Sequence, residues 1–338
     1  MISQLDNTVV RGISSVVPTM IEENVNAAPY LGERRCKKQI KLTGIERRHV
    51  SPLDQKMSDL CFSAAKQLID SLQWRPEEIK VLILLTQNPN YIAPSTAFLL
   101  QKMLQIPNDC IVFDANLGCS SFNVGLQIVS ALLQQFPGEA KGLCLQGDMA
   151  YEAIRPEVLP SDMAGAMLFG SAGSATAIEK MTDAVPVPFA TFSDGRRYQA
   201  ILRKAGESLR MDGEGVFNFS TNDVAEAIMD FREHFAIDEA DIDFYVFHQA
   251  QKLILDSIAA ACHIPEHKEL RSLRDYGNTS GASVPLSICV NRERFLDRKE
   301  VKLLTCGFGV GLSWSMAYLP IATDGVLPVG TSDEIFEG

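Results

Sequence analysis

Cys119 lies where a predicted buried strand gives way to a predicted helix, in the segment FDANLGCSSFNVGLQIVS (113–130). Residues 111–113 are apolar, residues 114–118 are small or polar, and from Phe122 onward the apolar residues recur at helical spacing. The free N–H groups and the dipole at a helix start favour a thiolate over a thiol, so Cys119 is a candidate nucleophile. The alternative is a small buried cysteine that packs at the start of a helix.

A histidine and an asparagine in the second half of the chain stand at comparable positions. His248 follows the apolar residues 245–247 and precedes a predicted helix, which places it at the carboxyl end of a strand, where functional groups gather in open α/β sheets. Asn278 lies in YGNTSGAS (276–283), and its amide can both donate and accept hydrogen bonds. Taken singly, such a histidine is more often a core residue whose ring nitrogens are hydrogen-bonded within the protein. A Gly-Asn pair is more often part of a turn with a structural role only.

The segment GFGVG (307–311) follows a predicted strand and carries a glycine at every second position. Its backbone N–H groups can approach a ligand oxygen closely, as an oxyanion hole requires. A dinucleotide-binding loop fits less well, because Trp314, Met316 and Tyr318 continue as a strand instead of a helix. Phe308 is a candidate wall of the substrate pocket, although its ordinary role, like that of Trp314, is core packing.

The composition of the 338 residues, 46% hydrophobic and 22% charged, is that of a globular protein without obvious membrane spans. The net charge is -11, and the basic residues cluster only at 34–38, so neither nucleic acid nor a membrane is an expected partner. The first ten residues show no signal-peptide pattern. The eight cysteines lack zinc-ligand spacing, which fits a reducing cytoplasm and predicts no metal site.

Predicted strands and helices alternate along the whole chain, which indicates an α/β fold. Residues 59–72 form an amphipathic helix by their spacing, and 79–86 a strand buried on both faces. The segment TGIERRHV (43–50) reads as a turn followed by basic, exposed residues. Because both halves contain a strand–loop–helix arrangement, we predict two similar halves, residues 1–180 with Cys119 and residues 181–338 with His248 and Asn278.

Eight segments occur in an order that resembles the β-ketoacyl-acyl-carrier-protein synthase III family of the thiolase superfamily. They are TGIERRHV, NLGCSSF, LFGSAGSATAI, SDG, MDGEGVF, FHQAQ, YGNTSGASVP and GFGVGLSW. Each is a weak signal alone, but together they cover nearly the whole chain and include the cysteine, histidine and asparagine. The resemblance implies a thiolase-like, five-layered αβαβα fold of two duplicated halves, and usually a homodimer.

The resemblance also implies the chemistry. Cys119 would take an acyl group from a thioester of acyl carrier protein or coenzyme A, with the amides of Cys119 and Gly311 as the oxyanion hole. A malonyl thioester would lose carbon dioxide while His248 and Asn278 donate hydrogen bonds to the enolate oxygen. The carbanion would then attack the acyl group to give a β-ketoacyl product. No cofactor is expected.

Several positions depart from the family's usual pattern. In places where housekeeping members often carry a tryptophan or an arginine that holds coenzyme A, this chain has Lys38, Leu42, Glu152 and Leu253. Ala93 stands where an aromatic residue often closes the acyl pocket across the dimer, so a longer or bulkier acyl group is expected. Ser120 and Ser121 replace a small apolar neighbour. These departures predict a specialised member, in secondary metabolism, rather than the initiator of fatty acid synthesis.

Two other functions are open to such a chain. One is a non-decarboxylative acyltransferase that passes the Cys119 acyl group to an oxygen, nitrogen or other carbon nucleophile, with His248 as general base. The other is a non-catalytic subunit of a heterodimer with a related enzyme, which retention of Cys119, His248 and Asn278 argues against.

Overall fold

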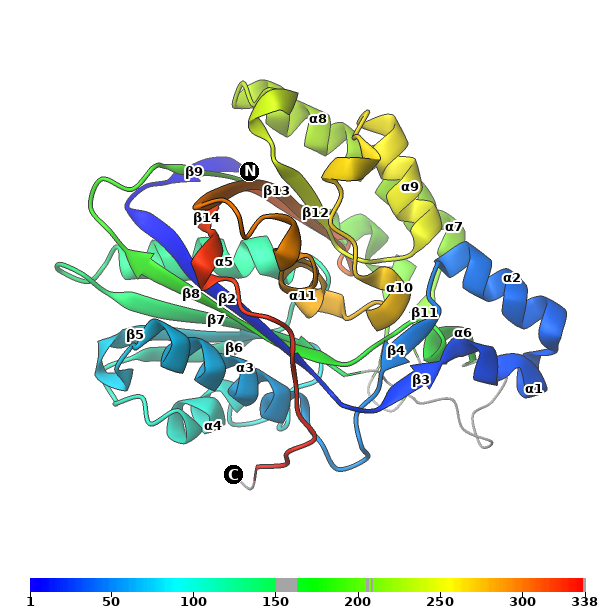
Figure 1. Ribbon diagram of the computed structural model, residues 1–338, viewed down its shortest axis with the longest axis horizontal. Helices are drawn as coiled ribbons and strands as arrows, with labels where there is room; N and C mark the ends of the chain where they lie inside the picture. The colour runs from blue at the N-terminus through cyan, green and yellow to red at the C-terminus, as the bar shows by residue number, and fades with distance from the viewer. Residues whose placement is uncertain (150–162, 205–206, 208, 337–338) are drawn as a thin grey trace.

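Five layers of helices and sheets build the protein in this computed structural model, which describes residues 1–149, 163–204, 207 and 209–336 (Figure 1). Two half-sheets enclose a central pair of helices, and further helices cover the outer face of each half-sheet. This is the α/β layering that the alternating strands and helices predicted.

The first half-sheet has the strand order β2-β8-β7-β5-β6. Its strands are β2 (Thr8–Val17), β5 (Ile79–Leu85), β6 (Ile111–Ala115), β7 (Lys141–Asp148) and β8 (Ala172–Lys180), with the short β15 (Gly330–Thr331) beside β2. Strand β5 pairs in parallel with β6 and β7, so their carboxyl ends meet at one edge. Helices α3 (Met57–Leu72) and α4 (Thr96–Met103) cover the outer face, which explains why β5 is apolar on both sides.

The second half-sheet has the order β1-β9-β14-β13-β12. Its strands are β1 (Ile2–Leu5), β9 (Val187–Ser193), β12 (Phe244–Phe247), β13 (Glu300–Gly309) and β14 (Ser313–Ala322). Helices α8 (Val224–His234) and α9 (Lys252–Ala261) pack on its outer face. The pairing of Val10 in β2 with Ile321 in β14 joins the two half-sheets into one continuous sheet.

Helices α5 (Ser121–Leu133) and α11 (Ser283–Val290) form the central layer. The buried Asn123 ties α5 to the second half-sheet, because its Nδ2 donates to the Ser315 carbonyl at 3.0 Å and its Oδ1 accepts from Thr305 Oγ1 at 2.6 Å. The start of α5, directly after Cys119, is thereby fixed against both halves of the chain.

The remaining helices and strands flank the edge at which the parallel strands end. They are β3 (Ile21–Glu23), α1 (Ala28–Leu31), α2 (Glu33–Thr43), β4 (Arg47–His49), α6 (Met163–Ala166), β10 (Ile201–Leu202), β11 (Arg210–Met211), α7 (Gly213–Asn218) and α10 (Leu273–Tyr276). Short 3₁₀ turns include η7 (Ser280–Ala282), which precedes α11. Among the described residues, every helix is too short or too polar to cross a bilayer.

The division into residues 1–180 and 181–338 stays a prediction. Strand β8 ends at Lys180 and β9 begins at Val187 in the other half-sheet. Strand β1 nevertheless pairs with β9, and β15 pairs with β2, so each terminus of the chain lies in the half-sheet of the opposite half.

Arg48 corrects the prediction that residues 43–50 are basic and exposed, because its side chain is fully buried. Its guanidinium donates to Glu22 Oε2 at 2.6 Å, to Asn24 Oδ1 at 3.0 Å and to the Phe169 carbonyl at 2.8 Å. Five N–H donors in a fixed fork allow one arginine to satisfy three partners from distant parts of the chain. Arg48 therefore holds together the segments beside the site described below.

Arg48→Met is expected to destabilise the fold strongly, because breaking a buried charge pair costs about 3–5 kcal/mol. The free energy of unfolding in urea measures this loss. Arg47→Met is the matched control: Arg47 donates to the half-exposed Asp275 at 2.7 Å, and exposed pairs contribute about 0–1 kcal/mol. Equal losses in the two variants would contradict the structural role given to Arg48.

Candidate active site

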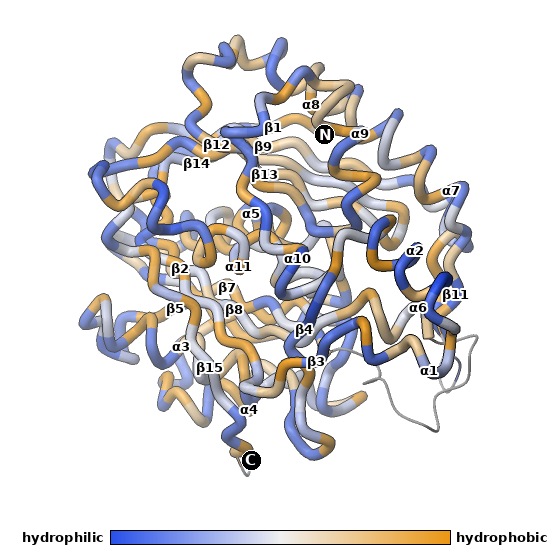
Figure 2. The backbone as a smooth tube through the Cα atoms, turned by 45° about the vertical axis from the view of Figure 1, so that its right-hand side comes forward, coloured by the Kyte–Doolittle hydropathy of each residue, from blue (hydrophilic) through white to orange (hydrophobic). Residues whose placement is uncertain are grey.

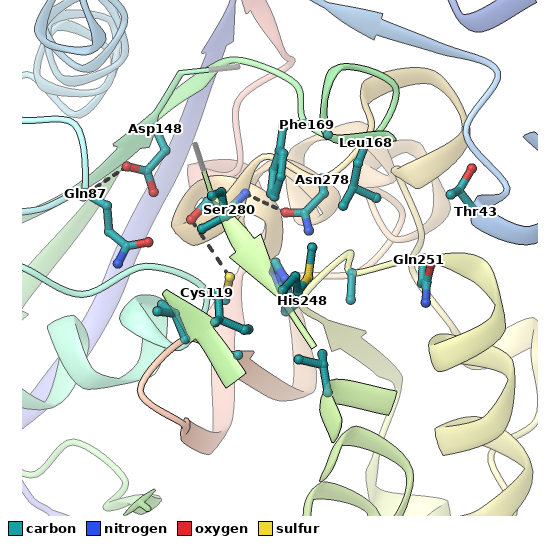
Figure 3. Close-up of a pocket in the computed structure, with 18 of the residues that line it drawn as sticks. Thr43, Gln87, Cys119, Asp148, Leu168, Phe169, His248, Gln251, Asn278 and Ser280 are labelled. Carbon is teal, nitrogen blue, oxygen red and sulfur yellow. Dashed lines mark hydrogen bonds between the residues drawn. The ribbon is translucent and has the colours of Figure 1, made fainter. Parts of the chain in front are cut away.

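A cavity of about 650 Å³ opens where the carboxyl ends of the strands meet α2, α7 and α9, and it receives side chains from both halves of the chain. Cys119, His248 and Asn278 all line it (Figure 3). The structure thus brings Cys119 together with His248 and Asn278, which sequence analysis selected from segments more than a hundred positions further along the chain.

Cys119 occupies the turn between β6 and α5, and neighbouring glycines allow this close packing. A Cβ on Gly118 would lie 2.5 Å from Gln87 Oε1, and a Cβ on Gly309 would lie 2.8 Å from the Cys119 Cβ. Burial, together with the charge of Asp148, raises the pKa of the Cys119 thiol to about 11. The backbone N–H groups at the helix start do favour the thiolate, as expected, but burial outweighs them and the group is a thiol at neutral pH.

His248 directly follows β12 and is almost completely buried. The Ser283 hydroxyl accepts from the Gln249 N–H at 3.4 Å and lies 2.8 Å from His248 Nδ1, and the Ser280 backbone also hydrogen-bonds the ring. A neutral imidazole carries one hydrogen, so one of its two nitrogens donates and the other accepts. Burial lowers the pKa of His248 to about 4, so the ring is neutral at physiological pH. Phe308 packs edge-on against the ring, with 5.5 Å between ring centroids.

Asn278 is held by backbone contacts on both sides. Its N–H donates to the Leu168 carbonyl at 2.9 Å, and its own carbonyl accepts from the Gly170 N–H at 3.0 Å. The side-chain Oδ1 accepts from the Ser280 N–H at 2.9 Å, which leaves Nδ2 as the donor end of the amide. The site thus offers a neutral imidazole and the Asn278 Nδ2 donor beside a half-buried thiol.

The oxyanion segment differs by one residue from the prediction. Phe308, Gly309 and Val310 line the cavity, whereas Gly311 does not. Strand β13 ends at Gly309, so the Val310 N–H is the backbone donor that faces the Cys119 sulfur, and Gly311 already lies in the turn toward β14. We therefore assign the second oxyanion donor to Val310 in place of Gly311. Phe308 is both a wall of the cavity and a buried core residue.

The other predicted positions lie around the cavity or away from it. Ala93 is exposed in the loop after β5 and does not line the cavity of the single chain. Lys38 and Leu42 on α2 and Leu253 on α9 are exposed, and Glu152 lies outside the described residues. Ser120 and Ser121 are buried beneath the cavity, where the Ser120 hydroxyl lies 2.7 Å from that of Ser313.

Among the cavity residues that the sequence analysis did not single out, Gln87, Asp148 and Ser280 lie beside the nucleophile. Asp148 is the last residue of β7, so the rule that singled out His248 at a strand end could have found it. Within the described ranges, no group of three or more histidine, cysteine or acidic side chains has the geometry of a metal site.

Comparison with known proteins shows the family of this chain. Residues 233–321 match the family model described as 3-oxoacyl-[acyl-carrier-protein (ACP)] synthase III C terminal. The β-ketoacyl-[acyl-carrier-protein] synthase III of Clostridium perfringens is 31% identical over 294 residues, which cover 82% of this chain and 89% of that protein. The chain belongs to the β-ketoacyl-acyl-carrier-protein synthase III family. It is a condensing enzyme of the acyltransferase class.

Solved structures support the fold of this synthase III family member over its whole length. A 3-oxoacyl-(acyl-carrier protein) synthase from Burkholderia xenovorans LB400 superposes with a TM-score of 0.92 at 29% identity, covering 98% of this chain and 99% of that one. The OleA protein of Xanthomonas campestris, at 20% identity and a TM-score of 0.81, covers 92% of this chain and 97% of its own and shares the fold. The predicted thiolase-like fold is confirmed.

Proposed function

We propose that this condensing enzyme loads an acyl group from a thioester onto Cys119 and joins it decarboxylatively to a malonyl-type thioester, giving a β-ketoacyl product. The observation that carries the proposal is the convergence of one thiol, one neutral imidazole and one amide donor on one cavity. A base would serve simple acyl transfer, whereas neutral donors serve the stabilisation of a developing enolate.

In the first half-reaction the Cys119 sulfur attacks the carbonyl carbon of the acyl thioester. The N–H groups of Cys119 and Val310 receive the oxyanion of the tetrahedral intermediate, and both already face the sulfur. The carrier thiol leaves, and the acyl group stays on Cys119.

In the second half-reaction a malonyl thioester loses its carboxylate as carbon dioxide. The negative charge moves to the thioester oxygen, where His248 Nε2–H and Asn278 Nδ2–H donate hydrogen bonds. The α-carbon then attacks the carbonyl carbon of the Cys119 acyl group, and the cysteine is released as the carbon–carbon bond forms.

A basic helix beside the cavity supports an acidic carrier protein as the acyl donor. Helix α2 exposes five cations, at Arg34, Arg35, Lys37, Lys38 and Lys41, in a chain of net charge -11. In Figure 2 the hydrophilic stretches of α2 are drawn in blue. The same helix contributes Gln39 and Thr43 to the cavity wall. Opposite charges at the rim would steer an anionic carrier and its phosphate-bearing arm toward the opening. The exposed Leu42 and Leu253 stand where coenzyme A would need cationic or aromatic partners.

We further propose a specialised pathway and a homodimer. The wall of the cavity away from Cys119 is apolar, formed by Ile201, Leu209, Met211, Val216 and Ile254, which suits an acyl chain or a bulky apolar group. The loop that contains Ala93 also exposes Tyr91 and Ile92, and the adjoining α4 exposes Phe98. Such an exposed apolar cluster is typical of an interface with a second copy or a related subunit.

Ala93→Phe is expected to narrow the range of acyl chains, because in the dimer residue 93 would face the partner's acyl pocket. Competition between acyl thioesters of increasing length, read as the acyl mass on Cys119, measures the preference. Ala93→Ser, which adds one oxygen only, is the control. An unchanged preference in Ala93→Phe would refute this role of Ala93.

The function is tested by incubating the protein with an acyl-carrier thioester and a carboxyl-labelled malonyl thioester. Condensation predicts labelled carbon dioxide and β-ketoacyl product in equal amounts, and Asn278→Ala should lose both. Acyl transfer to another nucleophile without carbon dioxide would establish the non-decarboxylative alternative, which the lowered pKa of the buried His248 disfavours. No acylation of Cys119 by any thioester would favour a non-catalytic subunit.

A further inference from the structure

A buried carboxyl group lies in the cavity without a role in the mechanism described so far. Asp148 is 4% exposed at the end of β7. Its Oδ1 accepts from Thr86 Oγ1 at 3.1 Å and from the Gln87 N–H at 2.8 Å. Its Oδ2 is equally buried but makes no hydrogen bond of ordinary geometry within the described part of the chain. A half-satisfied carboxylate at this depth is costly, which points to a use.

The Ser280 hydroxyl lies between this carboxyl and the nucleophile (Figure 3). Ser280 Oγ is 4.0 Å from Cys119 Sγ, and the same hydroxyl, with the Gly281 N–H, is close enough to Asp148 to stabilise its charge. Ser280 has a left-handed backbone, with φ of 50°, and its N–H is bound by Asn278 Oδ1. An unusual backbone conformation therefore directs a hydroxyl toward both groups.

The first half-reaction needs an acceptor for one proton. Cys119 is a thiol at neutral pH, so attack on a thioester must release its hydrogen. His248 is a weak acceptor for it, because burial lowers the pKa of its ring to about 4. The other carboxylate of the cavity wall, Glu207, lies 3.2 Å from the Arg210 guanidinium in an ion pair.

We propose that Asp148 accepts the Cys119 proton through the Ser280 hydroxyl during acylation, an inference that rests on the proposed function. As the Sγ–carbon bond forms, the thiol hydrogen passes to Ser280 Oγ, and the hydrogen of that hydroxyl passes to the Asp148 carboxylate. The bond from carbon to the carrier sulfur then breaks, and the departing thiolate takes one proton back along the same path. Asp148 ends as a carboxylate, so no proton or electron is gained or lost.

The surroundings of Asp148 set the expected pH dependence. In the described part of the chain, two thiols interact with the charge of Asp148: Cys119 in the turn before α5 and Cys61 on α3. Burial raises the pKa of Cys61 as well. The remaining contacts, from the loop after β5 and from η7, are uncharged. Burial raises the pKa of Asp148 to about 6. The carboxylate is present above this pH, so acylation should slow as the pH falls through about 6.

The experiment measures the single-turnover rate of Cys119 acylation by rapid quench and intact mass, from pH 4.5 to pH 9. The parent should show an inflexion near pH 6. Asp148→Asn and Ser280→Ala should lose it and react about 10²-fold more slowly at pH 7.5, the usual effect of removing a proton acceptor. The double variant should be no slower than the slower single one, because both residues serve one step. The control Asp114→Asn, another carboxyl group at a strand end but outside the cavity, should keep the parent profile.

Retention of the parent rate and inflexion by Asp148→Asn would overturn the proposal, as would additive losses in the double variant. Asp148 also accepts a hydrogen bond from the backbone, so Asp148→Asn could fail to fold. In that case Ser280→Ala alone tests the proposal, because it leaves the hydrogen bonds of Asp148 to Thr86 and Gln87 intact. Alkylation of Cys119 by iodoacetamide reports the same proton loss without a thioester. If the parent shows the inflexion in alkylation but is never acylated by a thioester, the proposed function is wrong, whereas the proton path from Cys119 to Asp148 still stands.

Discussion

Gly309→Ala is expected to abolish acylation of Cys119. The added Cβ would lie 2.8 Å from the Cys119 Cβ and 3.0 Å from its sulfur, distances that real Cβ atoms do not tolerate. The φ of 153° at this position adds strain for any residue with a side chain. Neither the Gly309 backbone nor the Cys119 turn can move freely, because Gly309 belongs to β13 and the turn leads directly into α5. A 1 Å displacement of a reacting group can cost about 10²-fold in rate, and relieving this clash moves the Cys119 side chain from its position.

Intact mass after exposure to an acyl thioester measures the effect. Gly195→Ala is the matched control, because a Cβ there meets no atom within 4 Å and the position is outside the cavity. Normal acylation of Gly309→Ala, with the fold intact, would show that the sulfur does not react from the position described.

His248→Ala is expected to separate the two half-reactions. Its Nε2–H serves the enolate, so decarboxylative condensation should fall by about 10²–10³-fold, the usual cost of one oxyanion donor. Acylation of Cys119 should stay within a few-fold of the parent, because the thiol proton leaves by another route. Carbon dioxide release and acyl mass, measured on the same sample, report the two steps.

His234→Ala, at the exposed end of α8, is the control for loss of an imidazole and should leave both readouts unchanged. If His248→Ala lost acylation and condensation to the same degree, His248 would be acting as a base in the first step, which is the role that the non-decarboxylative alternative requires.

Local rules predicted the residues whose position depends on the nearest strand or helix. Cys119 follows the half-buried edge strand β6, where a buried strand was predicted, and His248 follows the buried strand β12. Both precede a helix, and alternation of such units is enough to place them at one edge of a sheet. The layered fold followed from the same alternation. Ala93 stays a prediction, because its contacts depend on a partner that the single chain does not provide.

Contacts between distant segments determine the features of the site that local sequence patterns do not predict. Arg48 is buried because Glu22, Asn24 and Phe169 supply its partners, and a basic run gives no sign of them. The protonated state of Cys119 follows from burial by elements of the other half, which outweighs the helix start. The shift from Gly311 to Val310 depends on the residue at which β13 ends, and strand ends are not encoded by glycine spacing alone.

The most direct test of the account follows one acyl group through both half-reactions. The protein is acylated, freed of donor, and then given carboxyl-labelled malonyl thioester, while the peptide that carries Cys119 is monitored by mass. We predict that the acyl mass disappears from Cys119 in step with the release of one carbon dioxide and the appearance of one β-ketoacyl product. An acyl group on another residue, or one that leaves Cys119 without carbon dioxide, would contradict the account.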